Sequence, residues 1–224
     1  MTAPVTVIIA ARNEAHRIAS AIDSAFASGA AEVIVADGAS EDATREVAAS
    51  RGAVVLPGEA MRARQFNRGA EVSGNATLLF LHADTTLPAG AAAAAADALA
   101  HGAAFGGFRI RFQEPLWRLR FVAFMVNLRT RFTRCPWGDQ AQFIAKSRFL
   151  AEGGFLEIPL MEDYELAVRM KSGSVVLPLT VTTSGRRFLA RGVVRTTVIN
   201  WIVIVGWRLG VSPERLARWY RGRN

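Results

Sequence analysis

His82 and Asp84 are the residues whose types and spacing could most directly do chemistry. They stand in the stretch FLHADTTLP, immediately after an apolar run over residues 77–81. A carboxylate in this position could bind Mg²⁺ or Mn²⁺ together with a diphosphate, and the metal would neutralise charge on a departing diphosphate. Coordination by His82 would favour Mn²⁺, because imidazole is the softer ligand. Alternatively, Asp84 caps the helix expected near Pro88 and His82 fills space.

Two further polar clusters follow apolar runs in the same way. Arg12-Asn13-Glu14 comes after residues 6–10, and Asp37-Gly38 comes after residues 32–36. If the strand order is 3-2-1-4, all three clusters line one crevice at the carboxyl ends of the strands, where open α/β sheets bind ligands. A carboxylate after the second strand suits a nucleoside, because it can accept hydrogen bonds from a base N–H or from ribose hydroxyls. Phosphate loops of the GxGxxG or GxxxxGKS type are absent from the sequence, which disfavours dinucleotide-binding and P-loop proteins.

The elements that must position these clusters alternate along the first part of the chain. Apolar runs of strand length cover residues 6–10, 32–36, 53–56 and 77–81, and segments with helical spacing cover 14–28, 41–50 and 59–72. Such runs indicate parallel strands buried on both faces. We expect Ser40 and Asp42 to cap the second helix, Gly52 to end it, and Pro88 to open an Ala-rich helix over 89–100. The first ~85 residues therefore predict a doubly wound α/β arrangement.

From residue 103 the pattern changes. AFGGFRIRF alternates apolar and polar residues and predicts a half-exposed or edge strand. We expect an amphipathic helix over 115–134, a strand over 140–145, a helix over 162–170, and short strands over 175–177 and 180–182 around Pro178. A long helix over roughly 187–207 and a short one from Pro213 complete the expected elements.

Composition sets limits on function. The chain has 224 residues, 51% of them apolar and 21% charged, which suits one globular domain with a sizeable core. The lone Cys135 excludes an intramolecular disulfide. No signal peptide is evident, and the longest apolar stretch, 198–207, is far short of the ~20 residues of a membrane span, so we expect a cytoplasmic protein. The net charge of +8 suggests an anionic partner: nucleic acid, anionic lipid or a phosphate-bearing small molecule.

Six motifs in order carry a resemblance to a known family: TVIIAARNEA, VIVADGASEDAT, RARQFNRGA, FLHADT, WGDQAQF and LMEDYELAVRM. Over about residues 4–220 the sequence resembles family 2 glycosyltransferases, and most closely the rSAM/selenodomain-associated transferase 2 group. The resemblance implies an α/β GT-A fold: a Rossmann-like, doubly wound, mixed and mostly parallel sheet flanked by helices, with a C-terminal helical segment. It implies one domain over 1–224, with a nucleotide-binding half to about 102, an acceptor and catalytic half over about 103–185, and C-terminal helices over about 186–224.

The resemblance also implies an activity and its site residues. It implies an inverting, hexosyltransferase-like enzyme that moves a sugar from a nucleoside-diphosphate sugar to an unknown acceptor with Mn²⁺ or Mg²⁺. Asp84 matches the last carboxylate of the family's DxD metal motif, and His82 replaces the first. Gly138, Asp139 and Gln140 would flank the acceptor side. The positions implied to bind the nucleotide are Ala11, Arg12, Glu14, Asp37, Arg64, Asn67, Ala83 and Asp84.

Glu162-Asp163 matches the family's acidic pair that supplies the catalytic base. Inverting transfer needs one carboxylate to take the proton of the attacking hydroxyl. We expect Asp163 to be that base, with Glu162 orienting it or the acceptor. The structural alternative is that both carboxylates only interact with the positive end of a helix dipole.

Several other residues leave alternatives open. Gly106, Gly107 and Arg109 lie where backbone could approach the donor sugar and a guanidinium could reach phosphate, but a bulge or close packing explains the glycines equally well. Arg186 and Arg187 could close over the diphosphate, although the family's QxxRW motif is absent from this sequence. His16 and His101 are expected to be exposed helix residues.

The C-terminal segment combines arginines with Trp201, Trp207, Trp219 and Tyr220. Such basic-aromatic helices can lie in a membrane interface, which would suit a lipid-linked acceptor. The alternatives are that the apolar side packs back onto the domain or forms a homodimer interface. Arginines of the helix over 115–134 could add to a basic face: Arg118, Arg120, Arg129, Arg131 and Arg134.

Three other functions compete with sugar transfer. A sugar-phosphate nucleotidyltransferase normally has a glycine-rich loop with a basic residue directly after the first strand, and ARNEAHR contains no glycine. A non-catalytic nucleotide-binding relative is favoured by the missing first DxD carboxylate and disfavoured by the intact Glu162-Asp163 pair. No nucleic-acid partner is expected, because the basic residues are scattered and no DNA- or RNA-binding motif is present.

Overall fold

The computed structural model describes residues 3–221, and its strands form one eight-stranded sheet. The order is β3-β2-β1-β4-β7-β6-β8-β5. The first four strands are β1 (Val5–Ala11), β2 (Glu32–Asp37), β3 (Val54–Pro57) and β4 (Thr77–His82). They pair in parallel, so the expected 3-2-1-4 order is confirmed. Uninterrupted β-branched and apolar runs form these strands because β1, β2 and β4 are buried on both faces.

The pairing register brings the polar clusters to one edge of the sheet. Ala11 of β1 pairs with Asp37 of β2, and Ala10 pairs with His82 of β4. Parallel strands in register end together, so the residues that follow them are neighbours. The crevice expected from the sequence therefore starts from adjacent strand ends.

The helices between these strands begin later than the sequence pattern suggests. They are α1 (Ile18–Ala27), α2 (Thr44–Ser50), α3 (Arg62–Val72) and α4 (Ala91–Ala100). Gly52, at φ +78°, ends α2 as expected. The capping expectation for Ser40 was wrong, because its Oγ accepts a hydrogen bond from the N–H of Asn13. Asp42 does accept the N–H of Thr44, at 3.0 Å. Gly90, at φ +76°, starts α4, so Pro88 precedes the helix.

The other four strands of the sheet are β5 (Thr85–Thr86), β6 (Phe105–Phe112), β7 (Phe143–Ala145) and β8 (Ser174–Thr183). β6 lies between β7 and β8, so of the two alternatives, a half-exposed strand or an edge strand, the edge strand was wrong. Its first four residues are buried, and only the later ones alternate. The two short strands expected around Pro178 form the single strand β8, with a register shift opposite Phe108 and Arg109. A proline lacks the N–H that a regular ladder needs, and a bulge accommodates it.

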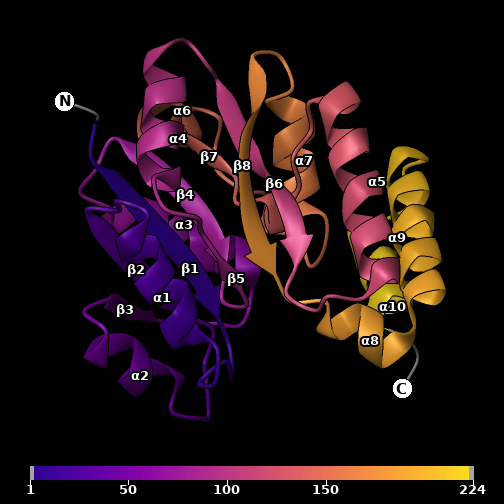
Figure 1. Cartoon of the computed structure of the whole chain (residues 1–224), viewed down its shortest axis with the longest axis horizontal. Coiled ribbons are helices and arrows are strands. Elements are labelled where there is room, and N and C mark those ends of the chain that lie inside the picture. Colours follow the sequence, from indigo (N-terminus) through magenta and orange to yellow (C-terminus); the bar gives the residue numbers. More distant parts are fainter. Residues whose placement is uncertain (1–2, 222–224) are drawn as a thin grey trace.

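The remaining helices are α5 (Trp117–Thr133), α6 (Lys146–Ala151), α7 (Glu162–Arg169), α8 (Arg186–Arg191), α9 (Val193–Arg208) and α10 (Pro213–Arg221), with a 3₁₀ turn η1 (Gly138–Gln140). Gly192, at φ +85°, divides the long helix expected over 187–207 into α8 and α9. Figure 1 shows α5, α8, α9 and α10 together at the end of the molecule opposite β1–β3. Across residues 3–221, no helix is long and apolar enough to cross a bilayer.

The core lies on both faces of the sheet. On one face the alanines of α4 pack closely against β1 and β4, as the low-complexity tract predicts. On the other face Phe66 of α3 meets Phe80 of β4 with ring centroids 5.2 Å apart, and Phe155 joins both. These aromatic contacts fix α3 against the end of β4, and so position the polar residues that each carries.

Candidate active site

Asp37, at the end of β2, has one carboxylate oxygen free beside a cavity. The side chain is buried, and Oδ2 accepts a hydrogen bond from the N–H of Ser40 at 3.0 Å. Within residues 3–221, the buried Oδ1 has no hydrogen-bond partner. The adjoining cavity has a volume of about 330 Å³ and is lined by Asp37, Leu56, Gly58, Arg64, Gln65 and others. Burying an unpaired acceptor is costly, so this site suits a ligand that brings an N–H.

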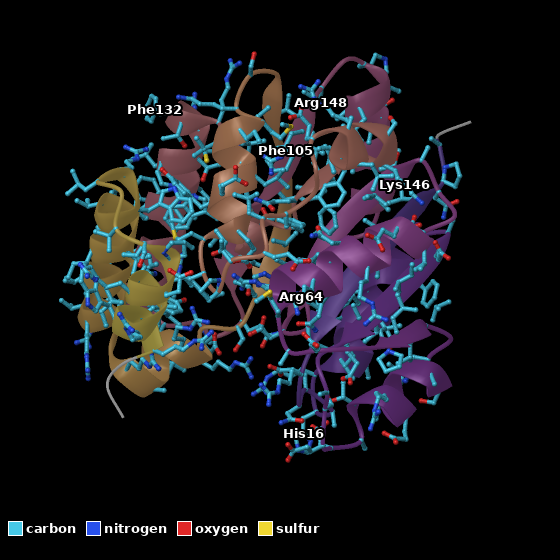
Figure 2. All side chains as sticks on the ribbon, turned by 180° about the vertical axis from the view of Figure 1, so that it is seen from behind. His16, Arg64, Phe105, Phe132, Lys146 and Arg148 are labelled. Atoms are coloured by element: carbon cyan, nitrogen blue, oxygen red, sulfur yellow. The ribbon has the colours of Figure 1, made fainter. Side chains whose placement is uncertain are left out.

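Helix α3 places two of its polar residues at this cavity and a third away from it. Gln65, which was not expected at the site, donates Nε2 to the carbonyls of Ala11 (2.9 Å) and Ala36 (2.6 Å) and so joins the ends of β1 and β2. Arg64 lines the cavity and pairs with Glu157 at 2.8 Å and with Glu59; Figure 2 shows it near the middle of the molecule, at the start of α3. Asn67 lies elsewhere, with both amide atoms bonded to the backbone of Phe155.

Asp84 and Glu14 share one cation, Arg186 of α8. The guanidinium lies 3.3 Å from Asp84 Oδ2 and donates two hydrogen bonds to Glu14, one of them 3.1 Å long. Burial raises the pKa of Asp84, and Arg186 opposes that shift. The strand ends of β1 and β4 therefore present two carboxylates to a single positive charge. Ala83, between His82 and Asp84, is buried in the core. Arg12 is exposed at the start of the loop after β1.

Arg187 follows Arg186 in α8. Burial lowers the pKa of Arg187, and so does the neighbouring Arg62, while Asp84 opposes the change. Its guanidinium lies 4.8 Å from the ring centroid of Tyr220. The end of β4 and the start of α3 are brought together by a different contact, because His82 stacks on Phe66.

His82 packs against α3 and reaches η1. Along β4 its side chain shares a face with Leu78 and Phe80, and its ring stacks on Phe66 with centroids 6.4 Å apart. Burial lowers the pKa of His82 to about 3, with help from Arg62, so the imidazole is neutral. In the described chain its buried Nε2 has no hydrogen-bond partner.

Asp163 and His82 converge on Gly138. Asp163 Oδ2 accepts the N–H of Gly138 at 2.7 Å. A methyl group on Gly138 would lie 2.8 Å from Asp163 Oδ2 and 3.0 Å from His82 Nε2. Only glycine leaves room for both side chains here, which explains why a residue without a side chain follows Trp137.

The acidic pair at the start of α7 is held by an arginine from α3. Glu162 is buried and forms an ion pair with Arg62. Burial would lower the pKa of Arg62, but the charges of Glu162 and Asp163 raise it above its ordinary value. Arg62 was not expected at the site, although it begins the RARQFNRGA motif. Arg62 precedes the buried Gln65 and Phe66 by three and four residues. This helical spacing could have indicated that Arg62 lies on the side of α3 that faces the sheet.

Asp139 and Arg129 are two further charged residues near the acidic helix. Burial raises the pKa of Asp139 to about 6, and Arg129 opposes the change. Arg129 was expected on an exposed basic face, but its guanidinium lies 3.3 Å from the ring centroid of Trp137 and burial lowers its pKa to about 10. Among the described residues, Asp139 Oδ1 and two nitrogens of Arg129 are buried without hydrogen-bond partners.

Other expected site residues have structural surroundings. Gln140 is fully buried and bonds to Arg129, Thr130, the N–H of Trp137 and the carbonyl of Phe108. Methyl groups on Gly106 and Gly107 would approach the ring of Phe143 at 2.2 Å and Pro136 at 2.6 Å. Close packing therefore accounts for both glycines. Arg109 is exposed on the strand face opposite Phe108 and Ile110.

Comparison with known proteins supports the fold and the family. Residues 6–150 match Glycosyl transferase family 2. The mannosyltransferase PcManGT from Pyrobaculum calidifontis, solved with GDP-Man and Mn²⁺, is 18% identical with a TM-score of 0.60, over 82% of this chain and 57% of that one. Mannosyl-3-phosphoglycerate synthase from Rubrobacter xylanophilus is 19% identical with a TM-score of 0.60, over 93% and 75%.

A third structure, glucosyl-3-phosphoglycerate synthase from Mycobacterium tuberculosis with Mn²⁺, UDP and glucosyl-3-phosphoglycerate, is 16% identical with a TM-score of 0.53, over 81% and 71%. The chain thus spans little more than half the length of the mannosyltransferase. No curated protein sequence matches it.

These likenesses confirm the expected GT-A architecture: a mixed sheet with flanking helices. The sequence match extends from β1 through α6 and so includes Asp37, Asp84 and Gly138. Because that match covers more than half of its residues, the chain belongs to glycosyl transferase family 2.

Proposed function

We propose that the protein is an inverting hexosyltransferase, of the rSAM/selenodomain-associated type, that uses a nucleoside-diphosphate sugar. One observation carries the proposal: Asp37, with an unpaired oxygen at a cavity, and His82, which meets Asp163 at Gly138, end β2 and β4 along the same sheet edge. The structures solved with GDP-Man or UDP support a nucleoside-diphosphate donor.

Asp163 is the proposed base. The N–H of Gly138 occupies Oδ2, which leaves Oδ1 for the acceptor hydroxyl, because no hydrogen bond within residues 3–221 reaches it. As the acceptor oxygen bonds to the anomeric carbon, its proton passes to Asp163. The bond from that carbon to the diphosphate breaks, and its electron pair stays on the diphosphate oxygen. Attack from the face opposite the leaving group inverts the anomeric centre, and no covalent enzyme intermediate is needed.

The cation implied by the family fits Asp84 better than His82. Asp84 and Glu14 already face one positive charge, that of Arg186, and carboxylates are the ligands that Mg²⁺ and Mn²⁺ prefer. His82 presents its nitrogen near Arg62, where a second cation would be repelled. Residues 3–221 contain no cluster of three or more His, Cys, Asp or Glu side chains that could hold an ion, so the diphosphate itself would complete the coordination. A cation bound there would neutralise charge on the leaving diphosphate.

A nucleotide-sugar panel tests the proposal. Hydrolysis or transfer would be measured for the wild type, Asp163→Asn and the control Asp97→Asn, which changes an exposed carboxylate on α4. We expect turnover by the wild type and the control, and a loss of at least 100-fold in Asp163→Asn with nucleotide affinity retained. Unchanged turnover in Asp163→Asn would remove the base assignment.

The panel also separates the rival functions. A non-catalytic relative would bind a nucleoside diphosphate without turning over any nucleotide sugar. A sugar-phosphate nucleotidyltransferase would release pyrophosphate from a nucleoside triphosphate instead. Either outcome would replace sugar transfer as the function of this site.

A further inference from the structure

The end of the molecule opposite β1–β3 carries apolar side chains that the fold leaves uncovered. On α5, Trp117, Phe121, Phe124, Met125 and Phe132 are exposed, with Trp117 71% and Phe132 77% accessible. Their spacing places them along one side of the helix, while Leu119, Ala123 and Thr130 face inward. Figure 2 shows Phe132 at the periphery of this end. We call these five residues the α5 stripe.

Helix α9 lies at the same end of the molecule (Figure 1), and its exposed residues repeat the arrangement. Its inward side chains, such as Val203 and Ile204, join the core cluster that contains Tyr164 of α7. Its outward residues recur at helical intervals and are at least half exposed: Val194, Val198, Trp201, Val205 and Leu209. We call these the α9 stripe. Apolar side chains exposed in such number on one part of a protein mark a surface that binds something.

The two segments that carry the stripes have charged residues of one sign only. Residues 115–138 and 166–213 contain no aspartate or glutamate. The exposed arginines on or next to α5 and α9 include Arg118, Arg131, Arg191 and Arg195. A partner that covers the stripes must therefore tolerate or neutralise several positive charges. A second copy of the same surface would bring arginines against arginines without acids between them, which disfavours a symmetric dimer.

We propose that the α5 and α9 stripes form a peripheral docking surface for an anionic lipid bilayer. Exposed tryptophan, phenylalanine and aliphatic residues enter the boundary between headgroups and acyl chains, and the flanking arginines pair with anionic headgroups. Helices of 17 and 16 residues are long enough to lie along this boundary. Because neither could span the bilayer, contact is confined to one leaflet. The active-site chemistry proposed above is not required for this surface to bind.

Sedimentation with sucrose-loaded vesicles tests the surface in the full chain. The vesicles are phosphatidylcholine alone, or an equal mixture of phosphatidylcholine and phosphatidylglycerol. The stripe variant Trp117→Ser/Phe121→Ser/Phe124→Ser removes apolar contacts, and its control Val54→Ser/Val72→Ser changes exposed apolar residues of the other half. The charge variant is Arg118→Gln/Arg131→Gln/Arg195→Gln, and its control is Arg51→Gln/Arg68→Gln/Arg148→Gln.

We expect the wild type and both controls to bind the anionic vesicles and not the phosphatidylcholine vesicles. Each arginine near an anionic surface raises partitioning about fivefold, so the charge variant should bind roughly 100-fold more weakly. The stripe variant should lose at least tenfold. All changed side chains are exposed, so thermal unfolding should stay near the wild-type temperature.

Three results would overturn the proposal. The first is absence of binding to anionic vesicles, and the second is a stripe variant that binds them as well as the wild type. The third is a dimer in size-exclusion chromatography with light scattering that the stripe variant dissociates, without vesicle binding by either form. That last result would assign the surface to self-association.

Discussion

Replacing Asp37 with asparagine should separate nucleotide binding from folding. The substitution keeps the size of the side chain, and the amide oxygen can still accept the N–H of Ser40, which Oδ2 accepts at 3.0 Å in the wild type. The amide nitrogen then takes the position of Oδ1, the oxygen without a partner beside the cavity. A donor would replace an acceptor at the point where we place the base N–H.

The expected loss follows from that one contact. A hydrogen bond to a charged acceptor contributes about 1.5–3 kcal/mol, which corresponds to a rise of roughly 10- to 150-fold in Kd for the nucleoside diphosphate. The free energy of unfolding should change by less than about 1 kcal/mol, because the variant loses an oxygen that the free protein buries unpaired and the 3.9 Å ion pair of Oδ2 with the exposed Arg45. Nucleotide binding should therefore respond more strongly than stability.

Isothermal titration calorimetry with UDP and GDP, each with Mn²⁺, measures the first effect, and urea unfolding measures the second. Asp97→Asn is the matched control, since Asp97 is exposed on α4 and its loss should change neither quantity. If Asp37→Asn binds both nucleotides within about twofold of the wild type, the carboxylate does not contact the base. The nucleotide site would then have to lie away from this cavity.

Three further perturbations address the catalytic side. Arg62→Met should lower the free energy of unfolding by about 2–3 kcal/mol in urea titrations, because it leaves the buried Glu162 unpaired, while the 36% exposure of Arg62 lets water screen the pair. Arg62→Met/Glu162→Gln should recover most of this loss; equal losses would contradict the pairing. Gly138→Ala should cut turnover at least tenfold with unchanged nucleotide affinity, because the added methyl reaches the proposed base, whereas Gly74→Ala, with open space around it, should be neutral in the same assays. Burial raises the pKa of Asp139 to about 6, so ionising this side chain destabilises the folded wild type as pH rises from about 4 to 6. The free energy of unfolding of Asp139→Asn, measured relative to wild type, should therefore be up to about 3 kcal/mol higher at pH 7 than at pH 4; a difference independent of pH would refute this.

The elements before residue 103 were predictable because each local signal agrees with the fold. The buried strands are uninterrupted apolar runs, and their ends carry the acidic residues that a parallel sheet brings together. Gly52 ends α2 at positive φ, as a glycine after a helix suggests. β6 failed as an expected edge strand because alternation describes only its second part, after the glycines that pack under Phe143 and Pro136.

The site residues that sequence reasoning missed belong to helices. In α3, Arg62 and Gln65 point inward beside Ala63 and Phe66. Motif position predicted Arg64 and Asn67 instead, whereas helical phase places Arg62 and Gln65 on the inward side. Arg129 was missed for a different reason: an arginine on an amphipathic helix is normally solvated, and only the tertiary contact with Trp137 explains its burial.

The surroundings of His82 explain the effect of a histidine at the position where the family's DxD motif has its first carboxylate. The side chain at position 82 shares a sheet face with Phe80, stacks on Phe66 and reaches Gly138 beside Asp163. An aspartate there would add a negative charge close to the proposed base, whereas the buried imidazole is neutral. With Arg62 and Arg187 both near this point, the crevice carries one negative charge fewer than a carboxylate would give it. Part of the electrostatic attraction for a diphosphate therefore comes from arginines of α3 and α8, which makes the loss of the first DxD carboxylate compatible with binding an anionic donor.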